Sequence, residues 1–132
     1  MCIVYVGLDL GSSSFHQVAI SSDGSLIVNR SFSTSELNLR KAFSDLRGEL
    51  QVHLEAGELA PWVSTVIAPL VQRVVCSHPA ANAWIARDAD KCDRIDAFKL
   101  AELLRLNRFQ EVHYRGRNRG ASSRRWCNTM TN

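Results

Sequence analysis

Four acidic residues have neighbours and spacings that favour a role in chemistry. Asp9 lies between two leucines in an apolar stretch, where a charged side chain is rare unless it is paired or bound to a metal. Glu55 ends a second apolar stretch, and Asp93 and Asp96 stand three residues apart ahead of an amphipathic segment. Because side chains at i and i+3 share one face of a helix, we expect Asp93 and Asp96 to lie side by side near a helix start. The alternative is that both acids only stabilise the helix N-terminus.

The apolar pattern predicts the elements that would position these acids. Residues 2–10 are rich in β-branched and aliphatic side chains and predict a buried strand, and Asp23-Gly24 predicts a hairpin turn. The expected elements are strands at 2–10, 15–21 and 25–32, a helix at 33–47, a strand at 50–56, a helix at 61–70, a strand at 73–77, a short helix at 79–86, a helix within 90–107 and a candidate last strand at 109–114. Ser33 or Thr34 is the expected N-cap of the first helix, with Glu36 near the capping-box position. The main order, βββαβαβα, implies an α/β fold with a mixed sheet flanked by helices.

Strand order then brings two of the acids together. In a sheet of this order the first strand is central, and strand 50–56 pairs beside it through a right-handed crossover. Asp9 and Glu55 would end neighbouring strands, at the edge where open α/β sheets place ligands. If the last helix packs across that edge, Asp93 and Asp96 complete a cluster of four carboxylates.

Such a cluster has a predictable chemistry. Carboxylates crowded together repel one another unless protons or cations neutralise them. Ligation by oxygen alone selects hard ions such as Mg²⁺ or Mn²⁺ over zinc. Two such ions about 4 Å apart activate the attacking oxygen and stabilise the leaving oxygen in phosphodiester cleavage. The four acids therefore predict a nuclease or recombinase site.

Composition limits the class of protein. The chain has 132 residues, 45% of them hydrophobic, which predicts one globular domain. No basic signal-peptide start and no apolar run of about 18 residues is visible, so we expect a cytoplasmic protein outside the membrane. The cysteines are scattered and predict reduced thiols, and the histidines are dispersed and predict packing or surface roles. These residues are Cys2, Cys76, Cys92, Cys127, His16, His53, His78 and His113.

Positive charge is concentrated in the last residues of the chain. The net charge is +3, and residues 114–132 contain five arginines and no acid, so the first 113 residues sum to 3 − 5 = −2. The tail has no periodic apolar pattern, and we expect it to be poorly ordered. Its arginines are candidate phosphate contacts for a nucleic acid, and a solvated tail without such contacts is the simpler alternative. The arginines are Arg115, Arg117, Arg119, Arg124 and Arg125.

Three segments resemble a known family, the DEDD-type insertion-sequence transposases related to the Piv DNA invertase. They are VGLDLGSSSFHQVAI, LEAG and DADKCDRIDAFKLAELLRLN, and together the resemblance covers about residues 3–113. In the third, Lys91, Asp93, Asp96 and Ala97 fit the family pattern Lys-Thr-Asp-x-x-Asp-Ala, with Cys92 in the place of threonine.

The resemblance implies a RuvC-like, ribonuclease-H-type fold for residues 1–113. It assigns the metal-binding, catalytic acids to Asp9, Glu55, Asp93 and Asp96. It also implies Mg²⁺ or Mn²⁺ as cofactor, double-stranded or branched DNA as partner, a structured guide RNA in some relatives, and homo-oligomers in the bacterial cytoplasm, associated with the nucleoid.

The chain departs from that family after residue 113. Family members continue through a helical segment into a C-terminal domain that supplies a serine, so we expect this chain to be truncated. The WCNTM stretch in the tail permits a family-like continuation in another reading frame, which predicts that residues 114–132 are a frameshift product. A stop codon in that alternate frame would contradict this prediction.

Two other functions compete with the transposase. A truncated chain that folds and binds DNA without cutting it is one. The other is a fragment of an actin-like or sugar-kinase ATPase, because GLDLGSSS also resembles the phosphate-binding hairpin of that superfamily. An enzyme of that kind needs a second lobe, which 132 residues do not hold.

Overall fold

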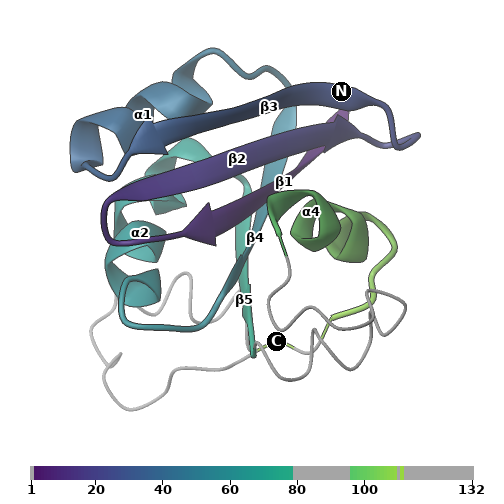
Figure 1. The fold of residues 1–132 in the computed structure, drawn as a ribbon. Helices are drawn as coiled ribbons and strands as arrows, with labels where there is room; N and C mark the ends of the chain where they lie inside the picture. The colour runs from purple at the N-terminus through teal and green to yellow at the C-terminus, as the bar shows by residue number, and fades with distance from the viewer. Residues whose placement is uncertain (1, 79–95, 110, 112–132) are drawn as a thin grey trace.

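A mixed five-stranded sheet forms the centre of the fold (Figure 1). The computed structural model describes residues 2–78, 96–109 and 111. The sheet order is β3-β2-β1-β4-β5. β1 is antiparallel to β2 and parallel to β4, as expected for a central first strand. The strand bounds are β1 Ile3–Leu10, β2 Ser14–Ser21, β3 Leu26–Ser33, β4 Glu49–Glu55 and β5 Arg73–Ser77.

Helices cover both faces of this sheet. α1 (Glu36–Ser44) and α2 (Ala60–Ile67) lie on one face, and α4 (Ala97–Arg105) lies on the other (Figure 1). A 3-10 turn, η1 (Ala68–Leu70), follows α2, because a proline inside it cannot continue the α-helical hydrogen bonds. The prediction of an α/β fold with a mixed sheet is confirmed. The helix expected at 79–86 lies outside the described residues.

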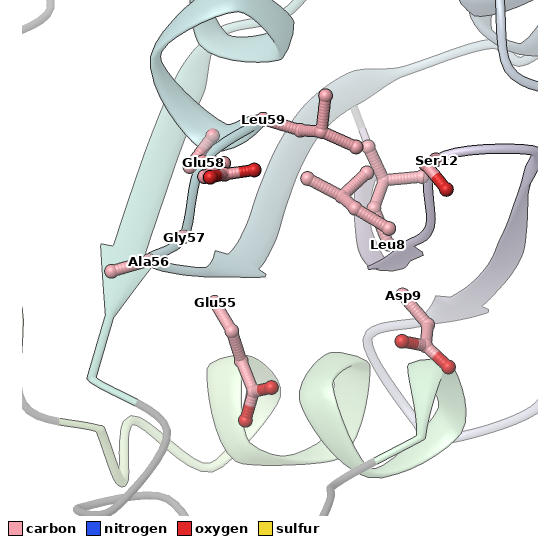
Figure 2. A pocket seen from close by; sticks show the side chains of 10 residues that line it. Leu8, Asp9, Ser12, Glu55, Ala56, Gly57, Glu58 and Leu59 are labelled. Atoms are coloured by element: carbon pink, nitrogen blue, oxygen red, sulfur yellow. The ribbon is translucent and has the colours of Figure 1, made fainter.

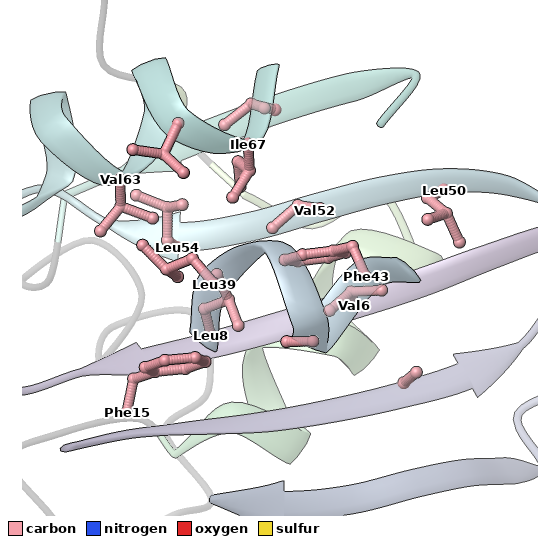
Figure 3. Packing of buried hydrophobic residues seen from close by; sticks show 14 of the residues in the cluster. Val6, Leu8, Phe15, Leu39, Phe43, Leu50, Val52, Leu54, Val63 and Ile67 are labelled. Atoms are coloured by element: carbon pink, nitrogen blue, oxygen red, sulfur yellow. The ribbon is translucent and has the colours of Figure 1, made fainter. Parts of the chain in front are cut away.

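The main core lies between the sheet and the pair α1 and α2 (Figure 3). Alternate side chains of a strand point to opposite faces, so Val6 and Leu8 of β1 enter this core together with Val52 and Leu54 of β4. All four are fully buried. Burial of an aliphatic side chain of this size stabilises a fold by about 1.5–3 kcal/mol. These strands are therefore fixed in register, and with them the residues at their ends.

The N-cap of α1 differs from the prediction. Ser35 is the cap, and its hydroxyl accepts a hydrogen bond of 3.1 Å from the backbone N–H of Asn38. The expectation of Ser33 or Thr34 is wrong, because β3 continues through Ser33 and delays the helix. Glu36 occupies the first helical position and does not complete a capping box, since the third position is Asn38.

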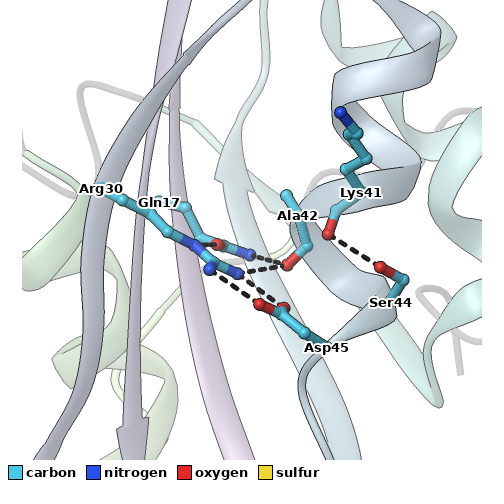
Figure 4. Close-up of polar contacts among 6 residues, drawn as sticks. All are labelled: Gln17, Arg30, Lys41, Ala42, Ser44 and Asp45. Atoms are coloured by element: carbon cyan, nitrogen blue, oxygen red, sulfur yellow. Dashed lines mark hydrogen bonds and ion pairs between the residues drawn. The ribbon is translucent and has the colours of Figure 1, made fainter.

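A polar network attaches β2 and β3 to the end of α1 (Figure 4). Gln17 and Arg30 both donate to the Ala42 carbonyl, at 3.0 and 2.9 Å, and Arg30 also donates to the Gln17 side-chain oxygen. The Arg30 guanidinium pairs with both oxygens of Asp45 at 2.9 and 3.0 Å and lowers the pKa of that carboxyl. The network thus satisfies the buried Gln17 and an unpaired carbonyl at the helix C-terminus.

Two predictions about the whole chain can be compared with the described residues. Cys2 is exposed and Cys76 is buried, and neither forms a disulfide within the described residues. None of the described helices is long and apolar enough to cross a membrane. Cys92 and Cys127 lie outside the part of the chain that the structure describes.

Candidate functional site

Asp9 and Glu55 lie side by side at the carboxyl ends of β1 and β4. Leu8 pairs with Leu54 in the parallel ladder, and the two acids follow directly. Neighbouring strands are about 4.8 Å apart, which places the two backbones within reach of one shared ion. Both acids are half-buried and line the same pocket of about 360 Å³, together with Ser12 and Glu58. The structure therefore brings together the two acids that the strand order predicted to meet.

The carboxylates of this pair face α4. Because Leu8 enters the main core on the other face, Gly7 and Asp9 point toward α4, and the same alternation in β4 turns Glu55 that way. Figure 2 shows both carboxylates directed toward the pale green helix, while Glu58 lies on the other side of the strand ends. Glu58 was not among the predicted site residues, because an exposed acid in a loop carries no sequence signal.

Gly7 allows α4 to rest directly on β1. A Cβ atom at this position would lie 2.0 Å from the carbonyl oxygen of Ala97 and 2.7 Å from the backbone nitrogen of Ala101. No real side chain tolerates such contacts, so only glycine permits this approach. Gly7 is two residues before Asp9, and the first turn of α4 is consequently held close to the acids.

Asp96 caps α4 rather than lying within it. Its backbone is extended (φ −79°, ψ 174°), and its side chain accepts a 2.9 Å hydrogen bond from the Lys99 backbone N–H. Asp96 thus stands at the boundary of the helix, and the predicted pairing with Asp93 involves a residue outside the described part of the chain. The short carboxylate accepts a hydrogen bond from an N–H group of the first turn, so α4 begins at the next residue. The rival capping role is confirmed for Asp96, which remains exposed beside Ala97, and Asp93 lies outside the described residues.

The donor set was compared with the needs of a divalent cation. Asp9 and Glu55 line one pocket, and carboxylate oxygen donors fit Mg²⁺ or Mn²⁺. Within residues 2–78, 96–109 and 111, no group of three or more His, Cys, Asp or Glu side chains is close enough to hold a metal ion. The described part of the chain thus brings together two candidate ligands, Asp9 and Glu55, and Asp93 lies outside it.

His53 is buried beneath these acids, on the α4 side of β4. It is 0% exposed and pairs with Gly7 across the ladder. Its Nδ1 lies 2.8 Å from the Leu100 carbonyl oxygen, and its Nε2 lies 2.6 Å from the Ser77 hydroxyl. Burial lowers the pKa of His53 to about 4, with a smaller contribution from the charge of Arg73, so the ring is neutral at pH 7. The expected packing role is confirmed for this histidine.

A further acid continues the row of polar residues across the sheet. Glu55 pairs with Ser77 of β5, and Ser77 in turn forms an antiparallel bridge with Glu111. The Glu111 Oε2 atom is buried and has no hydrogen-bond partner in the described residues. Burial raises the pKa of Glu111 to about 7, against the opposing effect of Arg73. Of the candidate strand 109–114 the structure describes Phe109 and Glu111, and Glu111 forms this bridge. Its role was not predicted, because a bridge between distant residues is not visible in sequence.

The remaining histidines and the tail arginines are partly within and partly outside the described residues. His16 is the cross-strand partner of Asp9 and hydrogen-bonds the side-chain oxygen of Asn29, and His78 is exposed. His113 and all five tail arginines lie outside the described residues. The latter are Arg115, Arg117, Arg119, Arg124 and Arg125.

The chain was also compared with known proteins. Residues 6–118 match the model of the IS110-type DEDD transposase family. No curated protein matches the chain. Among solved structures, the ethanolamine utilization protein EutJ from Carboxydothermus hydrogenoformans is similar, with 17% identity and a TM-score of 0.42, over 61% of this chain and 38% of that one. The chain thus spans well under half of that protein, and a TM-score this low supports no argument about function.

Proposed function

The chain belongs to the IS110-type DEDD transposase family, and on that premise we propose that residues 1–113 form a RuvC-like catalytic domain for metal-dependent DNA cleavage and strand transfer. The observation that carries the proposal is the meeting of Asp9 and Glu55 in one pocket at the ends of two parallel strands. The family assignment favours this function over the kinase alternative for the Asp9 strand.

The sheet supports a ribonuclease-H-type arrangement. Three antiparallel strands come first in the chain, and β4 and β5 then extend the sheet in parallel from the side of β1. This arrangement puts the carboxyl ends of β1 and β4 at the same edge. Ligands of open α/β sheets bind at such an edge.

In the proposed site, Asp9, Glu55, Asp93 and Asp96 hold Mg²⁺ or Mn²⁺, which supplies activation of the attacking oxygen and stabilisation of the leaving oxygen. Asp9 and Glu55 extend from the strand ends toward α4, and Asp96 is the N-cap of that helix. Asp96 binds the Lys99 N–H through one oxygen, which leaves its other oxygen as a candidate donor.

The proposed partner is double-stranded or branched DNA. The five arginines of the tail, Arg115, Arg117, Arg119, Arg124 and Arg125, are proposed to contact phosphates. Homo-oligomers, a structured guide RNA and a place in the bacterial cytoplasm beside the nucleoid follow from the family as further proposals. A DNA-binding remnant without cleavage is the alternative.

Cleavage of a branched DNA substrate separates these functions. We expect the purified chain to cut the substrate with Mn²⁺, and we expect Asp9→Asn and Glu55→Gln to reduce the rate by at least about a hundredfold, since each removes a metal ligand. DNA binding should persist in both variants. Binding without cleavage by the unmodified chain would identify the non-catalytic remnant, and cleavage that survives both substitutions would contradict the proposed site.

A further inference from the structure

Trp62 is a large aromatic side chain on the outer side of α2, and it is 38% exposed. The helix buries its other face at helical spacing, through Ala60, Val63, Ser64 and Ile67. Among the described residues, no aromatic ring or cation stacks on the indole. The ring therefore keeps an apolar surface in contact with water, which the core of the domain does not use.

The indole lies beside the pocket at the ends of β1 and β4. The backbone is already helical at the N-cap Leu59 (φ −85°, ψ −16°), and the Val63 N–H donates to the Leu59 carbonyl at 2.9 Å. In a helix, a side chain leans toward the N-terminus and covers the turn before its own Cα. The turn before Trp62 begins with Glu58 and Leu59, and both line the pocket. This direction places the indole at the pocket rim.

The charges of the pocket restrict which part of a nucleic acid can be bound directly. Among the described residues, those that line it include three acids, Asp9, Glu55 and Glu58, and no lysine or arginine. Carboxylates attract a phosphate only through a cation, so a direct contact to the strand has to come from another kind of group. A nucleobase is uncharged and has a flat π-face, which stacks on an aromatic side chain whatever the sequence. Trp62 supplies such a ring at the rim.

The small size of the apolar surface favours a nucleobase over a protein partner. The exposed neighbours of Trp62 on α2 are Pro61 and Thr65, and Glu58 is exposed in the preceding turn. The other exposed large hydrophobic side chains of the described residues belong to α1, β3, α4 and the turn after α4. A stable protein interface buries about 800 Å² on each partner, whereas a stacked base covers one ring. A single indole on this face fits the second requirement.

We propose that Trp62 stacks on an unpaired nucleobase of the DNA strand that enters the pocket, and so holds that strand beside Asp9 and Glu55. The inference rests on the proposed function, because it names a DNA contact of the same site. Trp62 is a binding residue in this account, and it touches neither a metal ion nor the reacting phosphate. Removal of an aromatic ring that stacks on one base weakens binding by about fivefold or more.

Two substitutions and a control test the stack. Trp62→Ala removes the ring, and Trp62→Phe keeps a smaller aromatic face. Ile27→Ala is the matched control, because Ile27 is 44% exposed and lies in β3 toward the opposite end of the sheet from Asp9. Thermal unfolding of all four proteins shows whether each variant is folded.

Fluorescence anisotropy of labelled single strands measures the affinity of the full chain in Mn²⁺. The probes are oligothymidine, an abasic oligonucleotide of the same length that keeps every sugar and phosphate, and oligouridine. We expect Trp62→Ala to weaken oligothymidine binding by at least about fivefold, Trp62→Phe to recover most of that loss, and Ile27→Ala to bind as the unmodified chain does. All four proteins should bind the abasic strand equally. A similar loss with oligouridine would support a stack that ignores the sugar.

The outcomes distinguish the inference from the proposed function. If the unmodified chain binds oligothymidine and Trp62→Ala binds it equally well, the stack is overturned while DNA binding stands. A loss confined to oligouridine, or an equal loss on the oligothymidine and abasic strands, would also overturn it. A changed oligomeric state of Trp62→Ala with unchanged affinity would identify a second copy of the chain as the occupant and overturn the stack. If the unmodified chain binds no strand, the proposed DNA partner is overturned, and the stack with it.

Discussion

Asp9, Glu55, Ser77 and Glu111 form a polar row across neighbouring strands on the α4 side of the sheet. The first two acids open into the pocket, whereas Glu111 has a buried oxygen without a partner in the described residues. The three acids of this row thus differ in their surroundings, and only Asp9 and Glu55 were predicted as site residues. An acid between apolar neighbours stands out in sequence, but Glu111 gains its setting from a bridge between residues far apart in the chain.

Glu111 makes stability depend on pH. The folded chain keeps its proton up to a pKa of about 7, whereas the usual value is 4.5, so between these values the folded state binds more protons than the unfolded state. Its free energy of unfolding should therefore fall as pH rises from 4.5 to 7. The Glu111→Gln side chain cannot ionise, so its free energy of unfolding relative to that of the unmodified chain should rise by on the order of 1 kcal/mol between pH 4 and pH 8. This is less than the full pKa shift implies, because solvent screens a half-exposed group.

Urea unfolding at both pH values measures this difference. Glu58→Gln, at an exposed glutamate, corrects for the general loss of one negative charge. A Glu111→Gln variant whose advantage does not grow with pH would show that this carboxyl ionises as readily as an exposed one.

The close packing of α4 on β1 at Gly7 holds the start of the helix near the strand ends. Gly7→Ala would place a Cβ atom 2.0 Å from the Ala97 carbonyl oxygen, so the helix must move away from the strand. Because backbone atoms cannot yield as a flexible side chain does, we expect a loss of at least about 2–3 kcal/mol in the free energy of unfolding and a loss of metal binding. Gly57→Ala is the matched control, since nothing lies within 4 Å of its added Cβ.

Chemical denaturation and a Mn²⁺ titration of both glycine variants test this contact. The two substitutions add the same methyl group near the same end of the sheet, so a difference between them reports the contact with α4. Equal stability of Gly7→Ala and Gly57→Ala would contradict the close packing of the helix.

The strands were predictable to within one residue at each end, and α1 and α4 were not. Three of these strands, β1, β4 and β5, are short apolar runs with several consecutive buried residues, because helices cover both faces of the sheet, and such runs between turn residues are visible in sequence. A helix starts where a short polar side chain accepts a hydrogen bond from an N–H group of the first turn. Stretches with several Ser, Thr or Asp residues, such as residues 33–35, offer more than one candidate for this cap. Ser35 is the N-cap of α1 because β3 extends to Ser33. Asp96 is the N-cap of α4, where its side chain accepts a hydrogen bond from the Lys99 N–H.

At the scale of the whole molecule, charge separates the domain from its tail. The first 113 residues sum to −2, and the five tail arginines carry the positive charge that the proposal assigns to DNA. Removal of residues 114–132 should lower the slope of log affinity against log salt by about 4–5 if every arginine neutralises one phosphate, because each contact contributes about 0.9 to that slope.

Fluorescence anisotropy of labelled DNA at several salt concentrations measures the slope. Replacement of the five arginines by glutamine in the full-length chain is the matched control, since it keeps the length of the tail. An unchanged slope in both variants would identify the tail as solvated and leave DNA contact to residues 1–113.

The central claim is a divalent-metal site that requires Asp9, and binding of Mn²⁺ to the unmodified chain and to Asp9→Asn tests it most directly. Asparagine preserves the shape of the side chain and removes its charge, so the fold should survive while metal affinity falls. We predict saturable Mn²⁺ binding by the unmodified chain and at least about a tenfold weaker affinity for the folded variant. Equal binding by the two proteins, or none by either, would contradict the account.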